Sequence, residues 1–594
     1  MNPKSYYHSQ RNTFAATLTK LTALRNKITF IKVIDFILAL TCTYQYMRQD
    51  QFGYLVGIAA FVIAFIILHR YESKLIAQAE LTATRIKCYD AEINYLNDNL
   101  SDFDEGNEYI EAQHTYAVDL DIFGRSSLFQ EMNRTITTGG KNLLAEILTN
   151  PTTDTVEIIE RQKAVQELSD TIDWIEEFRA KGISFRTNQA VSDPDPEWDS
   201  SKSIRFSGFT KGLIFASNIL FCALIAASLF YPHLLTIVAM YYIMQLFVTL
   251  SFSKRIELIQ NRLTRFVGAN VNFYRLVQMI QEKEFETTKL KQIYNQLFEQ
   301  GNALAAFKEI KSIMDKFDNR GNVIVLFGLN GCYMRDLHIM LQLQRLEAKQ
   351  LQQIPAWVKA VNELDALISM AIYRFNHPEY CTPIIDTTTI VSAHEMAHPL
   401  LKGEHIVTNN FTLQQLHEYF VVTGANMAGK STFLRSVGVN MVLALTGNVV
   451  RATTFHFTPI QLFTSMRTTD NLAGGISYFH AELLRLKKLV DAASAGNPLF
   501  IILDEMLKGT NSTDKLNGSI RFLEKIRTLP LCGLIATHDL ALGELSTKYP
   551  TEFHNICFEI EHTNEAISYD YKLKPGVSRN MNASILLKQM GLID

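Results

Sequence analysis

Four runs of apolar residues interrupt an otherwise mixed pattern of apolar and polar positions. The runs 212–231 and 234–252 contain no charged side chain. Twenty residues in a helix span about 30 Å, which is the thickness of a bilayer core. The run 52–68 is equally free of charge, whereas the run 33–47 is shorter and carries Asp35 near its start. The pattern therefore predicts four membrane-spanning helices, of which the first is the weakest.

Short turns join these runs into two transmembrane helical hairpins, at 33–68 and 206–253. By the positive-inside tendency, basic flanks place both termini and every soluble segment in the cytoplasm. The alternative is that the apolar runs are helices of a protein core, and Asp35 keeps it open mainly for the first hairpin. We expect a multi-pass protein, most simply of the bacterial inner membrane. The flanking residues are Arg25, Lys27, Lys32, Arg70, Lys74, Lys202, Arg205, Lys211, Lys254 and Arg255.

Composition narrows the functional classes. The 594 residues suffice for several domains, and a formal net charge of −3 excludes a wholesale basic nucleic-acid binder but not a local basic patch. The seven cysteines never occur in a C-x-x-C spacing, which disfavours a zinc site or a disulfide framework and favours a reducing cytosol for the soluble parts. The basic leader, 1–32, is too long for a cleavable signal, so we expect it to be retained.

The stretch VVTGANMAGKSTFLRS, residues 421–436, has the G-x-x-x-x-G-K-[ST] spacing of a phosphate-binding loop. It follows an expected strand at 419–422 and is expected to open a helix near Lys430. The backbone amides of such a loop wrap the phosphates, the lysine reaches the β- and γ-phosphate oxygens, and the serine holds Mg²⁺. This predicts ATP and Mg²⁺ as ligands. The expected contacts are Gly424, Asn426, Met427, Gly429, Lys430, Ser431 and Thr432.

Two acidic residues follow a second expected strand. The apolar run 500–503 ends at Asp504 and Glu505. Asp504 is predicted to support Mg²⁺ together with the loop serine, and Glu505 is predicted to orient or deprotonate the attacking water. A third strand ends at His538, which is placed to sense the γ-phosphate. An acid pair after a strand is often a helix cap, but the phosphate loop favours catalysis. The expected catalytic residues are Lys430, Glu505 and His538.

A second anion site is expected beyond the phosphate loop. A glycine-rich turn at Gly474 and Gly475 precedes Ser477 and an expected helix that carries Glu482. Such a turn at a helix N-terminus binds anions, yet the phosphate loop already supplies one anion site. The second site is therefore expected to serve the nucleotide of a partner subunit, as in dimeric ABC-type ATPases. This predicts a homodimer in which Ser477 acts in trans.

These motifs together resemble the MutS family of DNA mismatch repair ATPases, which are of the ABC type. The internal Asn426-Met427 of the phosphate loop resembles the MutS-type Walker A, and the stretches DNLAGGISYFHAEL, LDEMLKGTNSTD and ATHDLALGEL resemble the signature loop, the Walker B region and the strand that bears the histidine. The resemblance extends, in the family's order, to the helical core and to the segments around the ATPase domain. These further stretches are 119–168, 363–371, 398–401 and 571–592.

The resemblance implies a multidomain architecture, and it also leaves gaps. Nothing similar to the family's mismatch-reading wedge precedes residue 119, and the DNA clamp is absent or greatly shortened. The family's adenine-stacking position falls near Ile406, which would make an aliphatic contact. The expected domains are a cytoplasmic segment (1–32), a first transmembrane hairpin (33–68), a helical linker (69–115), an all-α MutS-like core (116–205), a second hairpin (206–253), a shortened helical lever and core return (254–385) and an α/β ABC-type P-loop ATPase domain (386–594).

The first functional hypothesis is a membrane-anchored MutS-like ATPase. It would hydrolyse ATP at a composite dimer interface and couple hydrolysis to DNA binding in mismatch repair or recombination, with ATP as the only small-molecule substrate. DNA binding needs basic side chains that face the phosphates. Candidates are Arg255, Arg262 and Arg265, but they lie just past the membrane, where they would equally bind anionic lipid headgroups.

The alternative is an ABC-type motor that acts on a membrane or protein partner without DNA. Its helices could form a conduit, but they lack polar residues along one face, and Gln245 is almost alone in 234–252. An anchor is therefore favoured over a transporter. A scaffold without ATPase activity is disfavoured, because every expected catalytic residue is present.

Overall fold

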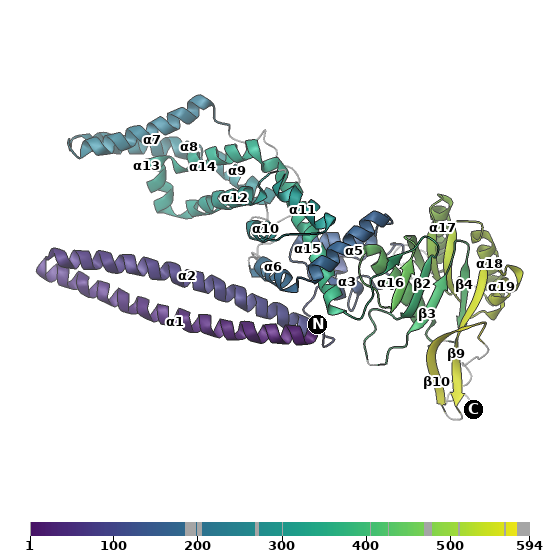
Figure 1. Ribbon diagram of the computed structural model, residues 1–594. Helices are drawn as coiled ribbons and strands as arrows, with labels where there is room; N and C mark the ends of the chain where they lie inside the picture. Colours follow the sequence, from purple (N-terminus) through teal and green to yellow (C-terminus); the bar gives the residue numbers. More distant parts are fainter. Residues whose placement is uncertain are drawn as a thin grey trace. The chain divides into compact units, whose positions relative to one another are not determined.

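The computed structural model is mostly helical, with two β-sheets in the C-terminal part of the chain (Figure 1). The chain forms two compact units. The first unit contains Met1–Thr13, Ile86–Ile175 and Asp365–Asp594, and the second contains Phe14–Arg85 and Glu176–Leu364. The structure describes residues 2–184, 198, 205–267, 273–299, 301–403, 405–425, 427–467, 478–508, 511–563 and 566–578.

A six-stranded sheet lies in the first unit, with the strand order β10-β9-β4-β8-β7-β6. The strands from β9 to β6 run parallel, and β10 is antiparallel to β9. The central strands β7 and β8 are nearly continuous apolar runs and are buried along their lengths, as expected where both faces of a parallel sheet are covered. The bounds are β4 Tyr419–Gly424, β6 Gln461–Ser465, β7 Leu499–Asp504, β8 Leu531–Ala536, β9 Phe553–Thr563 and β10 Ala566–Pro575.

A second, four-stranded sheet of the same unit has the order β1-β5-β2-β3 and mixed strand directions. Its strands are β1 Ile384–Ile385, β2 Val391–Met396, β3 Asn409–Leu413 and β5 Thr454–Phe457. The helices of this part of the unit are α16 Lys430–Thr446, α17 Tyr478–Ser494, α18 Ser512–Ile526, the 3₁₀ helix η8 Leu540–Glu544 and α19 Leu545–Lys548.

The remainder of the first unit is helical and is tied to the sheet by a buried carboxylate. Asp119 is 1% exposed and accepts hydrogen bonds from Thr464 Oγ1 (2.6 Å) and from the backbone nitrogen of Arg467 (2.8 Å). Arg485 also lies 3.2 Å from this carboxylate. The helices here are η1 Asn107–Tyr109, α3 Leu128–Met132, α4 Thr138–Thr149 and α5 Thr155–Ser169, together with the start of α6 Ile172–Ser184 and the end of α15 Ile354–Asn376.

The first unit also holds the start of α1 Pro3–Gln49 and the end of α2 Phe52–Tyr95. The hydroxyl of Tyr7, in α1, is buried and donates to Asn376 Oδ1 (3.0 Å). Glu92, in α2, forms a fully buried ion pair with Arg134 (2.8 Å). The guanidinium of Arg134 also lies 3.5 Å from the centre of the Phe103 ring. The start of α1 and the end of α2 therefore pack into the core of the first unit.

The buried ion pair gives a stability prediction. Glu92→Gln is expected to lower the free energy of unfolding of the first unit by about 3–5 kcal/mol, because it leaves the buried charge of Arg134 without its counter-charge. The measurement is the apparent unfolding midpoint of the full chain in detergent. The matched control is Glu80→Gln on the same helix, since Glu80 is exposed. An equal shift in both variants would contradict the role of the pair.

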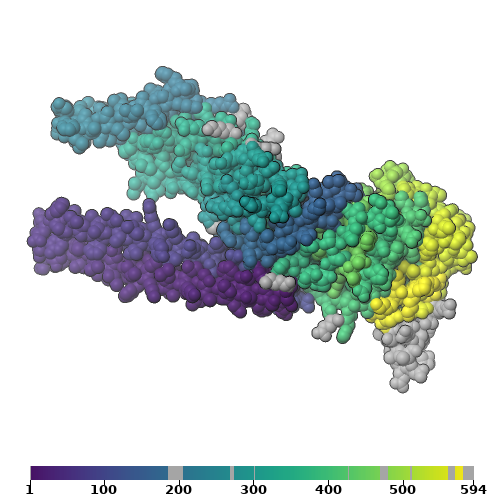
Figure 2. Space-filling view, in the orientation of Figure 1, coloured from purple at the N-terminus to yellow at the C-terminus, as the bar shows by residue number. Residues whose placement is uncertain are grey.

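In the second unit, α1 and α2 lie side by side (Figures 1 and 2). Glu72 of α2 accepts hydrogen bonds from Thr29 and Lys32 of α1, both at 2.6 Å. The pattern of apolar runs predicts boundaries between the hairpin and its flanks, 1–32 and 69–115. The helices instead run through these boundaries, since α1 extends from Pro3 to Gln49 and α2 from Phe52 to Tyr95. The reason is that neither helix contains an internal proline to end it.

The second hairpin consists of α7 Gly208–Ser228 and α8 Leu234–Ser251, which pack against each other. Within the described ranges, α1, α2, α7 and α8 are the four helices that are long and apolar enough to cross a membrane. The expectation of helical parts, an α/β part and four long apolar helices is thus met. The other helices of this unit are α9 Ser253–Val267, α10 Phe273–Gln281, α11 Thr288–Phe298, α12 Ala303–Asp318, η4 Asn319–Gly321, the π-helix η5 Ile324–Leu329, α13 Asn330–Tyr333, α14 Arg335–Lys349 and η6 Leu351–Gln353, together with the end of α6 and the start of α15.

Candidate nucleotide-binding site

The glycine-rich loop connects the end of β4 to the start of α16 in the first unit. Gly424 and Gly429 have φ values of +147° and +109°, a region that favours glycine. A Cβ atom at Gly424 would come within 2.6 Å of the carbonyl oxygen of Phe558, so a larger residue does not fit. Met427, the loop residue at the open side, is 77% exposed. The loop therefore presents its backbone at the carboxyl end of a parallel strand.

Lys430 is held inside this loop. Its side chain is 5% exposed, and Nζ donates to the carbonyl oxygens of Gly424 (2.7 Å) and Ala425 (2.9 Å). Burial lowers the pKa of Lys430, whereas the carboxylates of Asp504 and Glu505 act in the opposite direction. Two loop carbonyls thus hold an ammonium group at the phosphate loop, where it can meet an anionic phosphate.

Two oxygen ligands suited to a hard cation lie next to this ammonium. Ser431 Oγ donates to Asp504 Oδ2 over 2.7 Å. A hydroxyl and a carboxylate are the ligand types that Mg²⁺ takes in nucleotide sites, where phosphate and water complete the octahedron. The structure describes no group of three or more His, Cys, Asp or Glu side chains that could hold a metal alone. The donor set therefore fits Mg²⁺ bound together with a nucleotide.

Glu505 and His538 face each other at the ends of β7 and β8. His538 Nε2 lies 2.5 Å from Glu505 Oε1, and this hydrogen bond is the largest cause that lowers the pKa of Glu505 to about 2. His538 Nε2 also lies 3.5 Å from Lys430 Nζ. Glu505 has a φ of +55° and its backbone nitrogen donates to Ala536 O (2.9 Å), so the strand pairing holds the carboxylate in place.

Glu482 has a role that the sequence analysis did not assign. It is 3% exposed and lies in α17. Its carboxylate accepts hydrogen bonds from the backbone nitrogens of Leu507 (2.5 Å) and Lys508 (3.1 Å). Leu507 has a φ of +58°, so these bonds stabilise an uncommon backbone conformation just after Glu505. The sequence signal was its place in the signature-like stretch.

A cavity of about 340 Å³ adjoins the loop, and Gly429 and Thr432 form part of its wall. Ile406 also lines it, as does His398, whose pKa is lowered to about 4 by burial. The predicted adenine contact and the predicted phosphate contacts therefore border one space. The other lining residues are Met396, Ala397, Leu401, Lys402, His405, Val407, Asn409, Phe433, Ser436, Phe558 and Tyr571.

The remaining predicted residues fall into two groups. Asn426, Gly474, Gly475 and Ser477 lie outside the described residues, as does most of 571–592. The candidate DNA contacts belong to α9 of the second unit. There, two of the arginines are exposed, whereas Arg262 is half-buried with its guanidinium 5.2 Å from the centre of the Trp198 ring. The exposed pair is Arg255 and Arg265.

Comparisons with known proteins relate two regions of the chain to MutS proteins. Residues 113–194 match the family model MutS domain III, and residues 420–589 match MutS domain V. The chain is 32% identical over 237 residues to the DNA mismatch repair protein MutS of Anaplasma phagocytophilum (strain HZ), which is 39% of this chain and 28% of that protein. It is 29% identical over 232 residues to MutS protein homolog 4 of Homo sapiens, which is 37% of this chain and 24% of that protein. Each match spans less than a third of the relative's length.

Proposed function

This chain belongs to the MutS family, and on that premise we propose that it is a membrane-anchored, Mg²⁺-dependent ATPase that couples hydrolysis to DNA binding. The observation that carries the ATPase proposal is the meeting of five side chains at the carboxyl ends of β4, β7 and β8. We propose that 386–594 acts as the ATPase domain and 116–205 as the core domain. The five residues are Lys430, Ser431, Asp504, Glu505 and His538.

In the proposed reaction, each side chain has one role. Bound ATP supplies the phosphoanhydride bond, and Mg²⁺ compensates phosphate charge. Lys430 neutralises charge on the phosphates, while Ser431 and Asp504 hold the cation. Glu505 stays ionised because of its low pKa, so it can accept a hydrogen bond from water and orient it. His538 positions Glu505 through the 2.5 Å contact.

We further propose that the active form is a homodimer in which Ser477 completes the partner's site. Ser477→Ala is expected to slow hydrolysis while ATP binding stays near normal, because the serine contacts the nucleotide only across the interface. Mixing Ser477→Ala chains with Lys430→Ala chains should restore activity, since one site of each mixed dimer then has both residues intact. The measurement is the ATPase rate against mixing ratio. A rate that never exceeds the average of the two variants would exclude the action in trans.

The membrane part of the proposal assigns α1, α2, α7 and α8 as anchors, most simply in a bacterial inner membrane with the soluble parts in the cytoplasm. The four helices are apolar and long enough. Gln245, a polar residue within α8, is fully buried and donates to Ser217 Oγ of α7 (3.0 Å). Its amide nitrogen is thus used within the hairpin, which supports an anchor over a conduit.

DNA as the partner is tested with the Glu505→Gln variant in lipid nanodiscs with ATP. The variant is titrated with homoduplex, mismatched and four-way-junction DNA at about 150 mM salt, where loose electrostatic binding is suppressed. An ATP-dependent preference for one structure is the expected result and would support action in repair or recombination. Absence of binding to all three would favour the second candidate, an ABC-type motor with a membrane or protein partner. That candidate is favoured by Arg255, which is exposed in the first turn of α9, just after α8, where lipid headgroups are expected.

A further inference from the structure

A short apolar segment of the second unit, residues 322–333, has no role in the site described above. It forms the π-helix η5 and the short helix α13. Its side chains are unusually exposed: Val323 is 67% exposed, Ile324 is 79% exposed and Phe327 is 43% exposed. Exposing several neighbouring apolar side chains to water is unfavourable in free energy, because the hydrophobic effect favours burial of apolar surface. By sequence, this segment belongs to the expected helical lever and core return, 254–385.

The segment is docked on the second hairpin by specific contacts. A Cβ atom at Gly331 would overlap the ring of Tyr242, so glycine allows the backbone of α13 to lie directly on α8. The hydroxyl of Tyr242 donates to the carbonyl oxygen of Phe327 (3.0 Å). Asn218 of α7 donates to the carbonyl oxygen of Tyr333 (3.2 Å). Figure 1 shows α13 beside α7 and α8.

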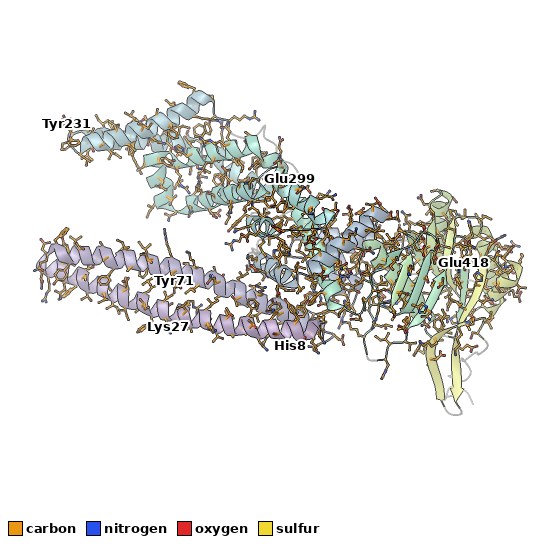
Figure 3. The ribbon with its side chains drawn as sticks, viewed as in Figure 1. His8, Lys27, Tyr71, Tyr231, Glu299 and Glu418 are labelled. Carbon is orange, nitrogen blue, oxygen red and sulfur yellow. The ribbon has the colours of Figure 1, made fainter. Side chains whose placement is uncertain are left out.

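These contacts lie at the middle of the hairpin. Tyr242 is nine residues from the C-terminal end of α8, which corresponds to about 13 Å along the helix axis. The opposite end of the hairpin is the turn at Tyr231 (Figure 3). If α7 and α8 cross a bilayer, the segment that lies on Tyr242 is at the depth of the acyl chains.

Both ends of the segment return to the base of the hairpin. Arg320, which precedes the segment, forms an ion pair with Asp336, which follows it (2.8 Å). Arg320 also donates to Ser253 Oγ (2.9 Å), and Ser253 is the first residue of α9, directly after α8. The Arg320 side chain therefore links both ends of the segment to the residue at which α9 begins, just after the apolar stretch of α8.

We propose that residues 322–333 are a re-entrant membrane element, which enters the acyl-chain layer beside α7 and α8 and leaves it on the same side. The covering partner is lipid acyl chains, because the exposed apolar side chains continue the apolar surface of α7 and α8. Backbone outside regular α-helix is tolerated at this depth only where protein groups satisfy it. Tyr242 and Asn218 do so for two of its carbonyl oxygens. The inference rests on the proposed membrane anchoring.

The test measures lipid contact of single fluorescent labels in the full-length protein. Val323→Cys reports on the segment, the native Cys222 reports on α7, and Val156→Cys is the control in the first unit. Val156 matches Val323 in side chain and in exposure, 62% against 67%. Each protein is labelled with an NBD dye in detergent and reconstituted into vesicles with or without doxyl-labelled phosphatidylcholine. The background replaces by alanine the accessible cysteines that are not used, from the set Cys42, Cys222, Cys332 and Cys381.

The expected result is strong quenching by doxyl lipid at 323 and at 222, with no change at 156. Quenching at 222 but not at 323 would overturn the re-entrant segment while leaving the anchor in place. Absence of quenching at both positions would instead overturn the membrane proposal itself. Disulfide-linked dimers formed through 323 in vesicles, without lipid quenching, would show that a second copy covers the segment and would also overturn the proposal.

Discussion

Lys430→Ala is expected to abolish measurable ATP binding, and hydrolysis with it. Nζ is buried within the loop and donates hydrogen bonds to the backbone carbonyl oxygens of Gly424 and Ala425. Without the ammonium group of Lys430, the bound phosphates lose a neighbouring positive charge in a buried site, where water screens electrostatic interactions poorly. Charge-assisted hydrogen bonds contribute about 1.5–3 kcal/mol each, and with more than one at stake the loss of affinity is on the order of 100-fold or more.

The measurement is equilibrium binding of a fluorescent ATP analogue to the protein in detergent, with thermal unfolding recorded in parallel. Lys548→Ala is the matched control, because Lys548 lies in the same unit but pairs with Glu524 on the surface (2.6 Å). We expect that control to bind normally. Normal affinity in Lys430→Ala, with its unfolding midpoint unchanged, would refute the assignment of the loop as the phosphate site.

Local patterns along the chain predicted local structure well. The apolar run 419–422 lies within β4, the run 500–503 lies within β7, and α16 begins at Lys430 as expected. These features depend on neighbouring residues only, because apolar continuity and glycine spacing act over a few positions. The MutS resemblance is confirmed by the family models for the same two regions.

Contacts between residues that are far apart in the sequence could not be predicted from local patterns. The bonds from Glu482 to the backbone after Glu505 and the docking of Tyr7 on Asn376 join positions whose sequence patterns are independent of each other. The segment 322–333 was missed for a different reason. It is too short for the length criterion of a spanning helix, which needs about 20 residues, and its docking depends on Gly331 fitting Tyr242.

Glu505→Gln is expected to reduce the rate of ATP hydrolysis by about 10²-fold or more, the order of effect expected when a reacting group loses its correct positioning. ATP binding should be retained, because the phosphate contacts are expected from Lys430 and Ser431 instead. The amide keeps the size of the side chain and can still accept a hydrogen bond from His538, so the local fold is preserved. What it loses is the negative charge that orients water.

The measurement is a single-turnover hydrolysis rate beside an ATP-binding isotherm, with Glu524→Gln as a control of the same chemistry on the surface of the same unit. An unchanged rate in Glu505→Gln would remove Glu505 from the reaction. The low pKa adds a second expectation. Because the hydrogen bond with His538 lowers the pKa of Glu505 to about 2, the carboxylate is expected to stay charged between pH 5 and 8, so wild-type activity should not fall in that range through protonation of Glu505. A fall in rate in that range would therefore come from a group other than Glu505.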